Sequence, residues 1–302
     1  MKGEIAMKNT IFTGAGVAIV TPMNDDGSIN YEELGRLIDF NIENGTDAII
    51  ICGTTGESST MSDEEHIECI KFAVERTAKR VPVIAGTGSN DTNYAIHLSQ
   101  EAEKLGADAL LLVTPYYNKT SQDGLVAHYT AIAESVSLPI IMYSVPSRTG
   151  VNITPDTCKR LSKVENIVAI KEASGNISQI AQIAAVCGDD LDIYSGNDDQ
   201  ILPIMALGAK GVISVLSNVA PKETHEIAML CYENNYAEAR KKMFAVQQLA
   251  KDLFCDVNPI PVKHALNAMG FKAGKPRMPL IELGDKNKEK LEATMREAGL
   301  IK

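Results

Sequence analysis

Apolar residues recur along the chain in short, nearly continuous runs that are separated by longer amphipathic stretches. Eight such runs stand at residues 16–20, 48–52, 81–85, 109–113, 139–143, 167–171, 191–194 and 211–216. Runs that are apolar almost throughout are typical of parallel strands buried on both faces of a sheet. The pattern therefore predicts eight strands.

The stretches between these runs carry helix signals. Ser62 and Glu65 have the spacing of a capping box, in which each side chain satisfies a free backbone N–H of the first turn. Thr154 precedes Pro155, a cap residue ahead of a proline at the first helical position. One apolar face at helical spacing is formed by Leu34, Leu37, Ile38 and Ile42. We expect a helix between each pair of strands.

Strand–helix alternation repeated eight times predicts an α/β fold, a (β/α)8 TIM barrel. A doubly wound open sheet is the competing fold, but residues 21–23 (Thr-Pro-Met) after the first run do not form its glycine-rich phosphate turn. Strand-like runs stop near residue 220, and helical patterns follow at 237–254, 262–269 and 287–298. We predict a catalytic barrel over residues 1–220 and a C-terminal helical extension over residues 221–302 packed on it.

Composition narrows the class of protein further. The 302 residues carry a net charge of −10 with no basic run, so we expect no nucleic-acid or membrane-surface partner. No apolar stretch reaches the roughly 20 residues that span a bilayer. The first residues lack the apolar core of a signal peptide, and Met7 is an alternative start. The six cysteines are scattered without CxxC spacing, which is typical of a reduced compartment. We therefore expect a cytoplasmic protein.

One lysine stands where barrel enzymes place their chemistry, at the carboxyl end of a strand. Lys171 ends the apolar run 167–171. Burial disfavours the charged form of a lysine, and a neutral amine attacks carbonyl carbons to form a Schiff base. Taken alone, the pattern favours a lysine whose head group reaches past an apolar stem into water, and only the other residues reverse this interpretation.

Other strand ends carry polar and aromatic residues. Thr54 and Thr55 lie between two glycines, which favour a tight turn that presents N–H groups to an anion. Tyr117 and Tyr143 are candidate proton relays, and Arg148 offers a planar fork for a carboxylate. Each residue alone also has a structural interpretation. The threonines fit an ordinary turn, each tyrosine fits a packing role in the core, and the arginine fits a surface ion pair.

The remaining polar residues receive structural interpretations. We expect Asp198 and Asp199 to cap the following helix and Glu172 to point away from Lys171, since side chains alternate along a strand. Helical positions suggest structural or interfacial roles for Tyr94, His97 and His128. None of the five histidines stands at a strand end, so we expect no metal site, and there is no G-x-S-x-G hydrolase motif.

Several of these segments together resemble the dihydrodipicolinate synthase family, and the resemblance runs from about Gly14 to the end of the chain. The matching segments are Gly-Thr-Thr-Gly-Glu at 53–57, Pro-Tyr-Tyr-Asn at 115–118, Tyr-Ser-Val-Pro-Ser-Arg-Thr-Gly at 143–150, Ile-Lys-Glu-Ala at 170–173, Ser-Gly at 195–196, Gly-Val-Ile-Ser-Val at 211–215 and Asn-Pro-Ile-Pro-Val-Lys at 258–263.

The resemblance implies a Schiff-base-forming lyase of diaminopimelate and lysine biosynthesis. Lys171 would condense with pyruvate, and the resulting enamine would attack L-aspartate-4-semialdehyde, with no cofactor beyond the covalent imine. Tyr143, Thr55 and Tyr117 would relay protons, Tyr117 reaching into the site of a neighbouring subunit of a homodimer or homotetramer. Arg148 would hold the carboxylate of the semialdehyde. The pyruvate pocket would be lined by Thr54, Thr55, Gly196 and Ile213.

Two departures from the family pattern stand out. Ser144 replaces the asparagine that usually follows the catalytic tyrosine, and we expect a modest effect. In lysine-inhibited relatives, histidines and a glutamate form a regulatory pocket; His66 and Asn90 match, whereas Asp63 replaces a histidine and Tyr94 the glutamate. A lysine ammonium favours a carboxylate partner, so we hypothesise weak or absent inhibition by lysine, which a lysine titration of the activity tests.

Two alternatives remain open. N-acetylneuraminate lyase and 2-keto-3-deoxy sugar acid aldolases share the lysine and the tyrosine, so only the pocket for the second substrate separates them from the synthase. Arg148 and the threonine pair Thr54 and Thr55 favour the synthase. A barrel used only for binding is the other class, against which the complete set of reactive residues argues.

Overall fold

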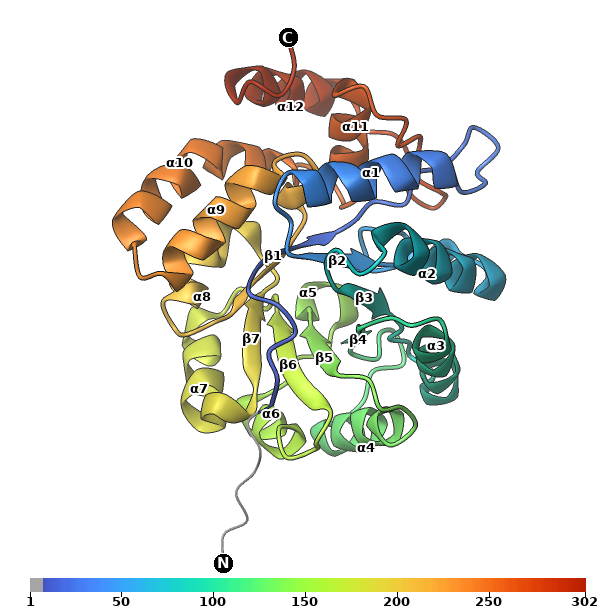
Figure 1. Cartoon of the computed structure of the whole chain (residues 1–302), viewed down its shortest axis with the longest axis vertical. Helices are drawn as coiled ribbons and strands as arrows, with labels where there is room; N and C mark the ends of the chain where they lie inside the picture. The colour runs from blue at the N-terminus through green and yellow to red at the C-terminus, as the bar shows by residue number, and fades with distance from the viewer. Residues whose placement is uncertain (1–7) are drawn as a thin grey trace, which may run out of the picture.

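Eight parallel strands form a closed barrel in sequence order, and β1 closes the ring by pairing with β8 (Figure 1). The computed structural model describes residues 8–302, so the alternative start at Met7 lies outside the described residues. The strands are β1 (Gly14–Ala18), β2 (Ala48–Ile51), β3 (Val83–Gly86), β4 (Ala109–Val113), β5 (Ile140–Ser144), β6 (Ile167–Glu172), β7 (Asp192–Ser195) and β8 (Gly211–Ser214). The predicted (β/α)8 barrel is confirmed.

Helices cover the outside of the barrel, as the pattern predicted. They are α1 (Tyr31–Glu43), α2 (Asp63–Thr77), α3 (Thr92–Lys104), α4 (Gln122–Ala133), α5 (Pro146–Thr149), α6 (Pro155–Leu161), α7 (Ile177–Cys187), α8 (Ile201–Met205), α9 (Pro221–Tyr232), α10 (Tyr236–Asp252), α11 (Ile260–Ala268) and α12 (Asp285–Glu297). Ser62 and Glu65 form the predicted capping box of α2, and the Thr154 side chain caps α6. Local sequence signals therefore set these helix starts.

The first strand begins two residues earlier than its apolar run indicated. Gly14 pairs with Gly211 of β8, and a Cβ built on Gly211 would lie 2.0 Å from the Gly14 carbonyl oxygen. Gly14 also has a φ of +111°, a backbone angle that residues other than glycine rarely adopt. Two facing glycines thus let the first and last strands approach and close the barrel.

Buried side chains divide into an inner and an outer core. The inner cluster fills the barrel, and the larger outer cluster lies between the strands and the helices. Within the barrel, the rings of Phe12 and Tyr194 stack with their centroids 4.4 Å apart, and the Tyr194 hydroxyl donates to the Phe12 carbonyl at 2.7 Å. Since Phe12 precedes β1, this pair fills the end of the barrel where the strands begin.

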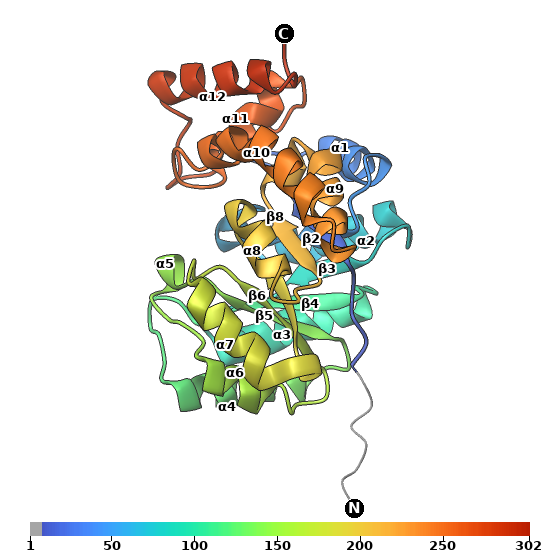
Figure 2. The same ribbon diagram turned by 90° about the vertical axis from the view of Figure 1, so that its left-hand side faces the viewer.

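The C-terminal helices lie together at one end of the molecule. Helix α9 packs against β1 and β8, and α12 packs on α10 and α11. Both ribbon views place α11 and α12 at the end of the molecule opposite α4 and α6 (Figures 1 and 2). No strand follows β8 in the described part of the chain, as the sequence predicted. The division of the chain at residue 220 stays a prediction.

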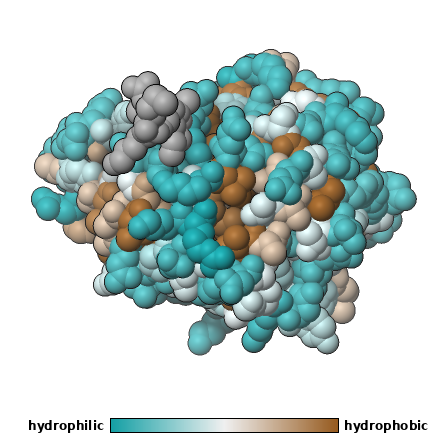
Figure 3. Space-filling model, turned by 90° about the horizontal axis from the view of Figure 1, so that it is seen from below, coloured by the Kyte–Doolittle hydropathy of each residue, from teal (hydrophilic) through white to brown (hydrophobic). Residues whose placement is uncertain are grey.

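The surface opposite the C-terminal helices is mostly hydrophilic, with small groups of hydrophobic residues between the polar ones (Figure 3). Among the helices of residues 8–302, none combines the length and the apolar character that a membrane crossing requires.

Candidate active site

Lys171 lies in a cavity at the carboxyl ends of the strands. It stands near the end of β6, its residue is 6% exposed, and it lines a cavity of about 220 Å³. Burial lowers the pKa of its amine to about 7, against the opposing effect of the Asp198 charge, and the Arg148 charge lowers it further. A substantial fraction of this amine is therefore neutral near pH 7.

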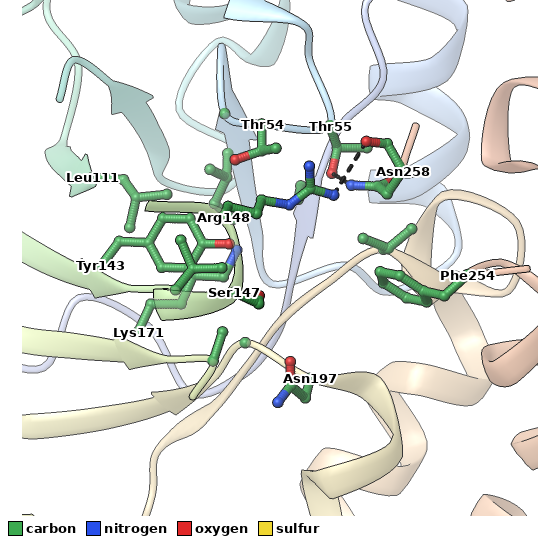
Figure 4. A pocket seen from close by; sticks show the side chains of 17 residues that line it. Thr54, Thr55, Leu111, Tyr143, Ser147, Arg148, Lys171, Asn197, Phe254 and Asn258 are labelled. Carbon is green, nitrogen blue, oxygen red and sulfur yellow. Dashed lines mark hydrogen bonds between the residues drawn. The ribbon is translucent and has the colours of Figure 1, made fainter. Parts of the chain in front are cut away.

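Tyr143 is an aromatic neighbour of the lysine. It is opposite Lys171 in the register of β5 and β6, and the lysine Nζ lies 4.3 Å from the centre of its ring. Burial raises the pKa of the Tyr143 phenol, while the Arg148 charge and a hydrogen bond with Thr54 act in the opposite direction. The phenol lies beside the amine (Figure 4). Its raised pKa keeps it protonated there, as a proton donor requires.

The turn after β2 brings Thr54 and Thr55 to the same cavity. The turn is tight: the N–H of Gly56 donates to the carbonyl of Gly53 at 3.1 Å, and the Thr21 hydroxyl donates to the carbonyl of Gly56 at 2.8 Å. The Thr55 hydroxyl is buried and accepts a hydrogen bond from Asn258 Nδ2 at 2.9 Å. Both threonines therefore lie where the sequence predicted, at the strand end that faces the lysine.

Arg148 reaches the cavity from the short helix α5, directly after β5. One guanidinium nitrogen donates to the backbone carbonyl of Asn258 at 3.2 Å, which leaves the other donors of the fork free to bind a carboxylate. Figure 4 shows the side chain extending between Tyr143 and Thr55.

Two predicted pocket residues take different positions. Gly196 lines the cavity, and a Cβ there would lie 2.7 Å from Ala173 Cβ and 3.2 Å from Lys171 Cε, so glycine leaves room for the lysine side chain. Ile213 is buried in the inner core and does not line the cavity, whereas Val215 does. The role of Ile213 in the pyruvate pocket stays a prediction.

Tyr117 is not brought to the lysine within one chain. Its side chain is 92% exposed in the loop between β4 and α4, with a φ of +69°, and it lines none of the cavities described here. The relay of Tyr143, Thr55 and Tyr117 stays a prediction that needs a neighbouring subunit.

The prediction that Asp198 and Asp199 cap the helix that follows them is wrong. No side chain caps the short helical turn that follows β7. The carboxylate of Asp198 is buried, and its Oδ2 accepts the backbone N–H groups of Val215 and Leu216 at 3.2 and 2.9 Å. It ties the end of β7 to the end of β8, because the N–H groups left free at that strand end need an acceptor.

The expected orientation of Glu172 is confirmed. Its carboxylate accepts from the Ser174 N–H at 2.8 Å and from Gln179 at 3.0 Å, on the helix side of β6. Burial raises the pKa of this carboxyl group. It is not a partner of Lys171.

Several further residues line the cavity that sequence reasoning gave no role there, among them Ser147, Asn197, Phe254 and Asn258. The last two belong to the C-terminal region, which no periodicity placed over the barrel mouth. The Asn-Pro pair at 258–259 gave a loop signal and no signal of a site. Among residues 8–302, no group of three or more histidine, cysteine or acidic side chains is arranged to hold a metal ion.

A second cavity of about 330 Å³ adjoins the first and shares Thr54, Val145 and Arg148 with it. His66 and Tyr94 line it, and the His66 Nε2 lies 2.8 Å from the Gly86 carbonyl. Burial, together with Asp63, raises the pKa of Tyr94 to about 12, so a neutral phenol stands in this cavity. The hypothesis of weak inhibition by lysine stays a prediction.

Barrel and site together define a class of proteins, the lyases that carry a substrate as an imine on a lysine inside a (β/α)8 barrel. Residues 11–298 match the model of the Dihydrodipicolinate synthetase family. The chain belongs to this family.

The chain is similar to individual relatives over nearly its whole length. The chain is 59% identical to a 4-hydroxy-tetrahydrodipicolinate synthase of Lachnoclostridium phytofermentans, over 96% of this chain and 99% of the relative. It is 55% identical to that of Acetivibrio thermocellus, over 98% of this chain and 100% of the relative. The crystal structure of a chloride-inhibited dihydrodipicolinate synthase from Acinetobacter baumannii complexed with pyruvate is similar with a TM-score of 0.95, 45% identity, and coverage of 97% of this chain and 100% of that chain.

Proposed function

We propose that this chain catalyses the 4-hydroxy-tetrahydrodipicolinate synthase reaction, the condensation of pyruvate with L-aspartate-4-semialdehyde in diaminopimelate and lysine biosynthesis. The observation that carries the proposal is the buried Lys171 amine, whose pKa of about 7 leaves it nucleophilic next to the Tyr143 phenol. The relatives that match nearly the whole chain carry the name of this activity.

The first half of the reaction uses the lysine as nucleophile. The neutral Nζ of Lys171 attacks the keto carbon of pyruvate, and loss of water from the carbinolamine gives the imine. Loss of a proton from the methyl group then gives the enamine. The Tyr143 phenol, held protonated by its burial, is placed to donate the proton with which water leaves.

The second half forms the carbon–carbon bond. The enamine carbon attacks the aldehyde carbon of the semialdehyde, whose oxygen takes up a proton. The amino group of the same substrate then attacks the imine carbon, which closes the ring and releases Lys171 as the free amine. No electron acceptor or cofactor is needed, because the covalent imine alone activates pyruvate for these steps.

Binding groups follow from the same geometry. Arg148 holds the carboxylate of the semialdehyde with the donors that its bond to Asn258 leaves free. The turn at Thr54 and Thr55, with Gly196 and Ile213, forms the pyruvate pocket. Tyr117 completes the relay from a second copy of the chain, so a homodimer is the minimal active unit and a homotetramer is compatible with it. The cytoplasm is the proposed location.

Steady-state kinetics test the proposal against the sister activities. We expect turnover of pyruvate with L-aspartate-4-semialdehyde, and no cleavage of N-acetylneuraminate or of 2-keto-3-deoxy sugar acids at matched enzyme concentration. The Arg148 cation fits a carboxylate at this position better than a row of sugar hydroxyls. Cleavage of either sugar acid at a comparable kcat/KM, without condensation, would assign the chain to the sister activity.

A further inference from the structure

One buried side-chain amide of the C-terminal region, that of Asn258, lines the active-site cavity. Asn258 lies in the loop between α10 and α11, is 5% exposed, and lines the cavity. Its Nδ2 donates to Thr55 Oγ1 at 2.9 Å, across 203 positions of sequence. Figure 4 shows the contact at the edge of the cavity, next to the Arg148 guanidinium.

Local folding does not account for this side chain. Its Oδ1 is buried and forms no hydrogen bond within residues 8–302, and its only side-chain bond is the one to Thr55. Leaving a buried carbonyl oxygen without a donor costs about 1–3 kcal/mol. The amide therefore holds no part of its own loop together, and its one bond goes to a residue of the proposed relay.

The direction of that bond decides what Thr55 can do. A hydroxyl group has one proton to donate and two lone pairs to accept with. Because the amide N–H occupies a lone pair of Thr55 Oγ1, the hydroxyl proton points away from Asn258. The hydroxyl is then free to donate toward the cavity that Lys171 and Tyr143 share.

We propose that Asn258 is a positioning residue, which fixes the orientation of the Thr55 hydroxyl through its side-chain amide and so makes the C-terminal region part of the catalytic machinery. The inference rests on the proposed function and on the role of Thr55 in proton transfer.

Two neighbouring contacts do not depend on this side chain. Arg148 donates to the backbone carbonyl of Asn258, which a substitution retains. The same loop after β2 is also held through Glu57, whose carboxylate bonds Lys263 Nζ at 2.5 Å and the Arg277 N–H at 2.8 Å. Substitutions of Asn258 therefore test the bond to Thr55 and leave the docking of the C-terminal region in place.

A double-mutant cycle tests the proposal. Asn258→Leu removes the donor, and Thr55→Val removes the hydroxyl. We expect each variant to lower kcat about 10- to 100-fold, the scale of a misplaced or lost proton-transfer group, with KM for the semialdehyde changed less than about 3-fold. The double variant should be no slower than Thr55→Val alone, because Asn258 acts only through Thr55.

The isosteric Asn258→Asp variant separates orientation from packing. A carboxylate only accepts, so it turns the Thr55 proton toward itself and away from the cavity; we expect kcat as low as with leucine. The control is Asn267→Asp in α11. This variant also loses an amide donor, whose hydrogen bond to the Gly274 carbonyl is exposed, and it should keep full kcat.

Three results would overturn the proposal: full kcat in Asn258→Asp, effects of Asn258→Leu and Thr55→Val that multiply in the double variant, or an effect confined to KM. Trapping of pyruvate on Lys171 by borohydride is measured in parallel. If the unmodified enzyme fails to trap pyruvate, the proposed function fails; if all variants trap it but kcat does not follow the pattern above, only the role of Asn258 fails.

Discussion

The reactivity of Lys171 results from a balance between burial and two neighbouring charges. Burial is the largest effect and lowers the pKa of the amine to about 7, while the Asp198 carboxylate raises the pKa and the Arg148 guanidinium lowers it. Asp198 is itself buried and held by the N–H groups at the end of β8. Burial raises the pKa of Asp198, while these N–H groups and the Lys171 charge oppose that shift. The ionised form of Asp198 near the amine also stabilises the cationic imine that forms there.

This balance predicts how pyruvate capture depends on pH. Only the neutral amine attacks, so the rate of adduct formation should rise with pH through a midpoint near 7 and then level off. Asp198→Asn removes a charge that favours the ammonium form, and the midpoint should move to lower pH. Rates of borohydride trapping measured from pH 5 to 9 check this shift. The exposed neighbour variant Asp199→Asn should leave the midpoint in place, and an upward shift in Asp198→Asn would contradict the account.

At the scale of elements, an ion pair joins the C-terminal region to the loop after β2. Lys263 of α11 is 1% exposed and Glu57 is 3% exposed, and their side chains lie 2.5 Å apart. Glu57 Oε2 also accepts from the Arg277 N–H, and Lys263 donates to the Lys275 carbonyl. Burial lowers the pKa of Lys263 and the Glu57 charge opposes this shift. The pair therefore fixes the turn that carries the two threonines.

Breaking this pair should destabilise the protein strongly. Lys263→Met leaves the Glu57 carboxylate buried without its cation, which costs about 3–5 kcal/mol of unfolding free energy. Adding Glu57→Gln to the same chain removes the stranded charge and should recover part of the loss. Urea unfolding measures both effects. The exposed pair of Lys241 and Glu238 on α10 is the control, since Lys241→Met should cost no more than about 0.5 kcal/mol. A loss as small as that in Lys263→Met would refute this role of the pair.

The sequence predicts elements better than it predicts what faces the site. Apolar runs and capping residues locate the eight strands and most helices, because both depend on neighbours in the chain. The role of Asp198 depends on β8, some 17 positions away, and that of Asn258 on Thr55, 203 positions away. Such pairings follow from how the barrel closes and how the C-terminal helices pack on it, which no local pattern encodes. Lys171, Tyr143 and Arg148 were predictable because barrel sites gather at strand ends.

At the scale of the whole molecule, one predicted catalytic residue lies outside the cavity of its own chain. Tyr117 is almost fully exposed, with a backbone conformation that is uncommon for a residue with a side chain. An exposed tyrosine on a loop is placed to enter a symmetric partner, because a two-fold interface exchanges the same group in both directions. The proposed dimer would therefore contain two shared sites.

Mixing two inactive variants tests this sharing. Lys171→Ala and Tyr117→Phe should each have little activity alone. If the chains exchange, each mixed dimer holds one site with an intact lysine and an intact Tyr117, and a 1:1 mixture should recover about a quarter of the unmodified activity. Lys171→Ala mixed with Tyr143→Phe is the control, because both residues line the same cavity of one chain and no intact site can form. Equal activity in the two mixtures would exclude a shared site.

The most direct test of the central claim is mass spectrometry of the protein after incubation with pyruvate and reduction with borohydride. The account predicts one reduced pyruvyl adduct per chain, located by peptide mapping on Lys171, and none in Lys171→Ala even though that variant keeps its fold by circular dichroism. An adduct on another amine, or an unmodified Lys171 under conditions of turnover, would contradict it.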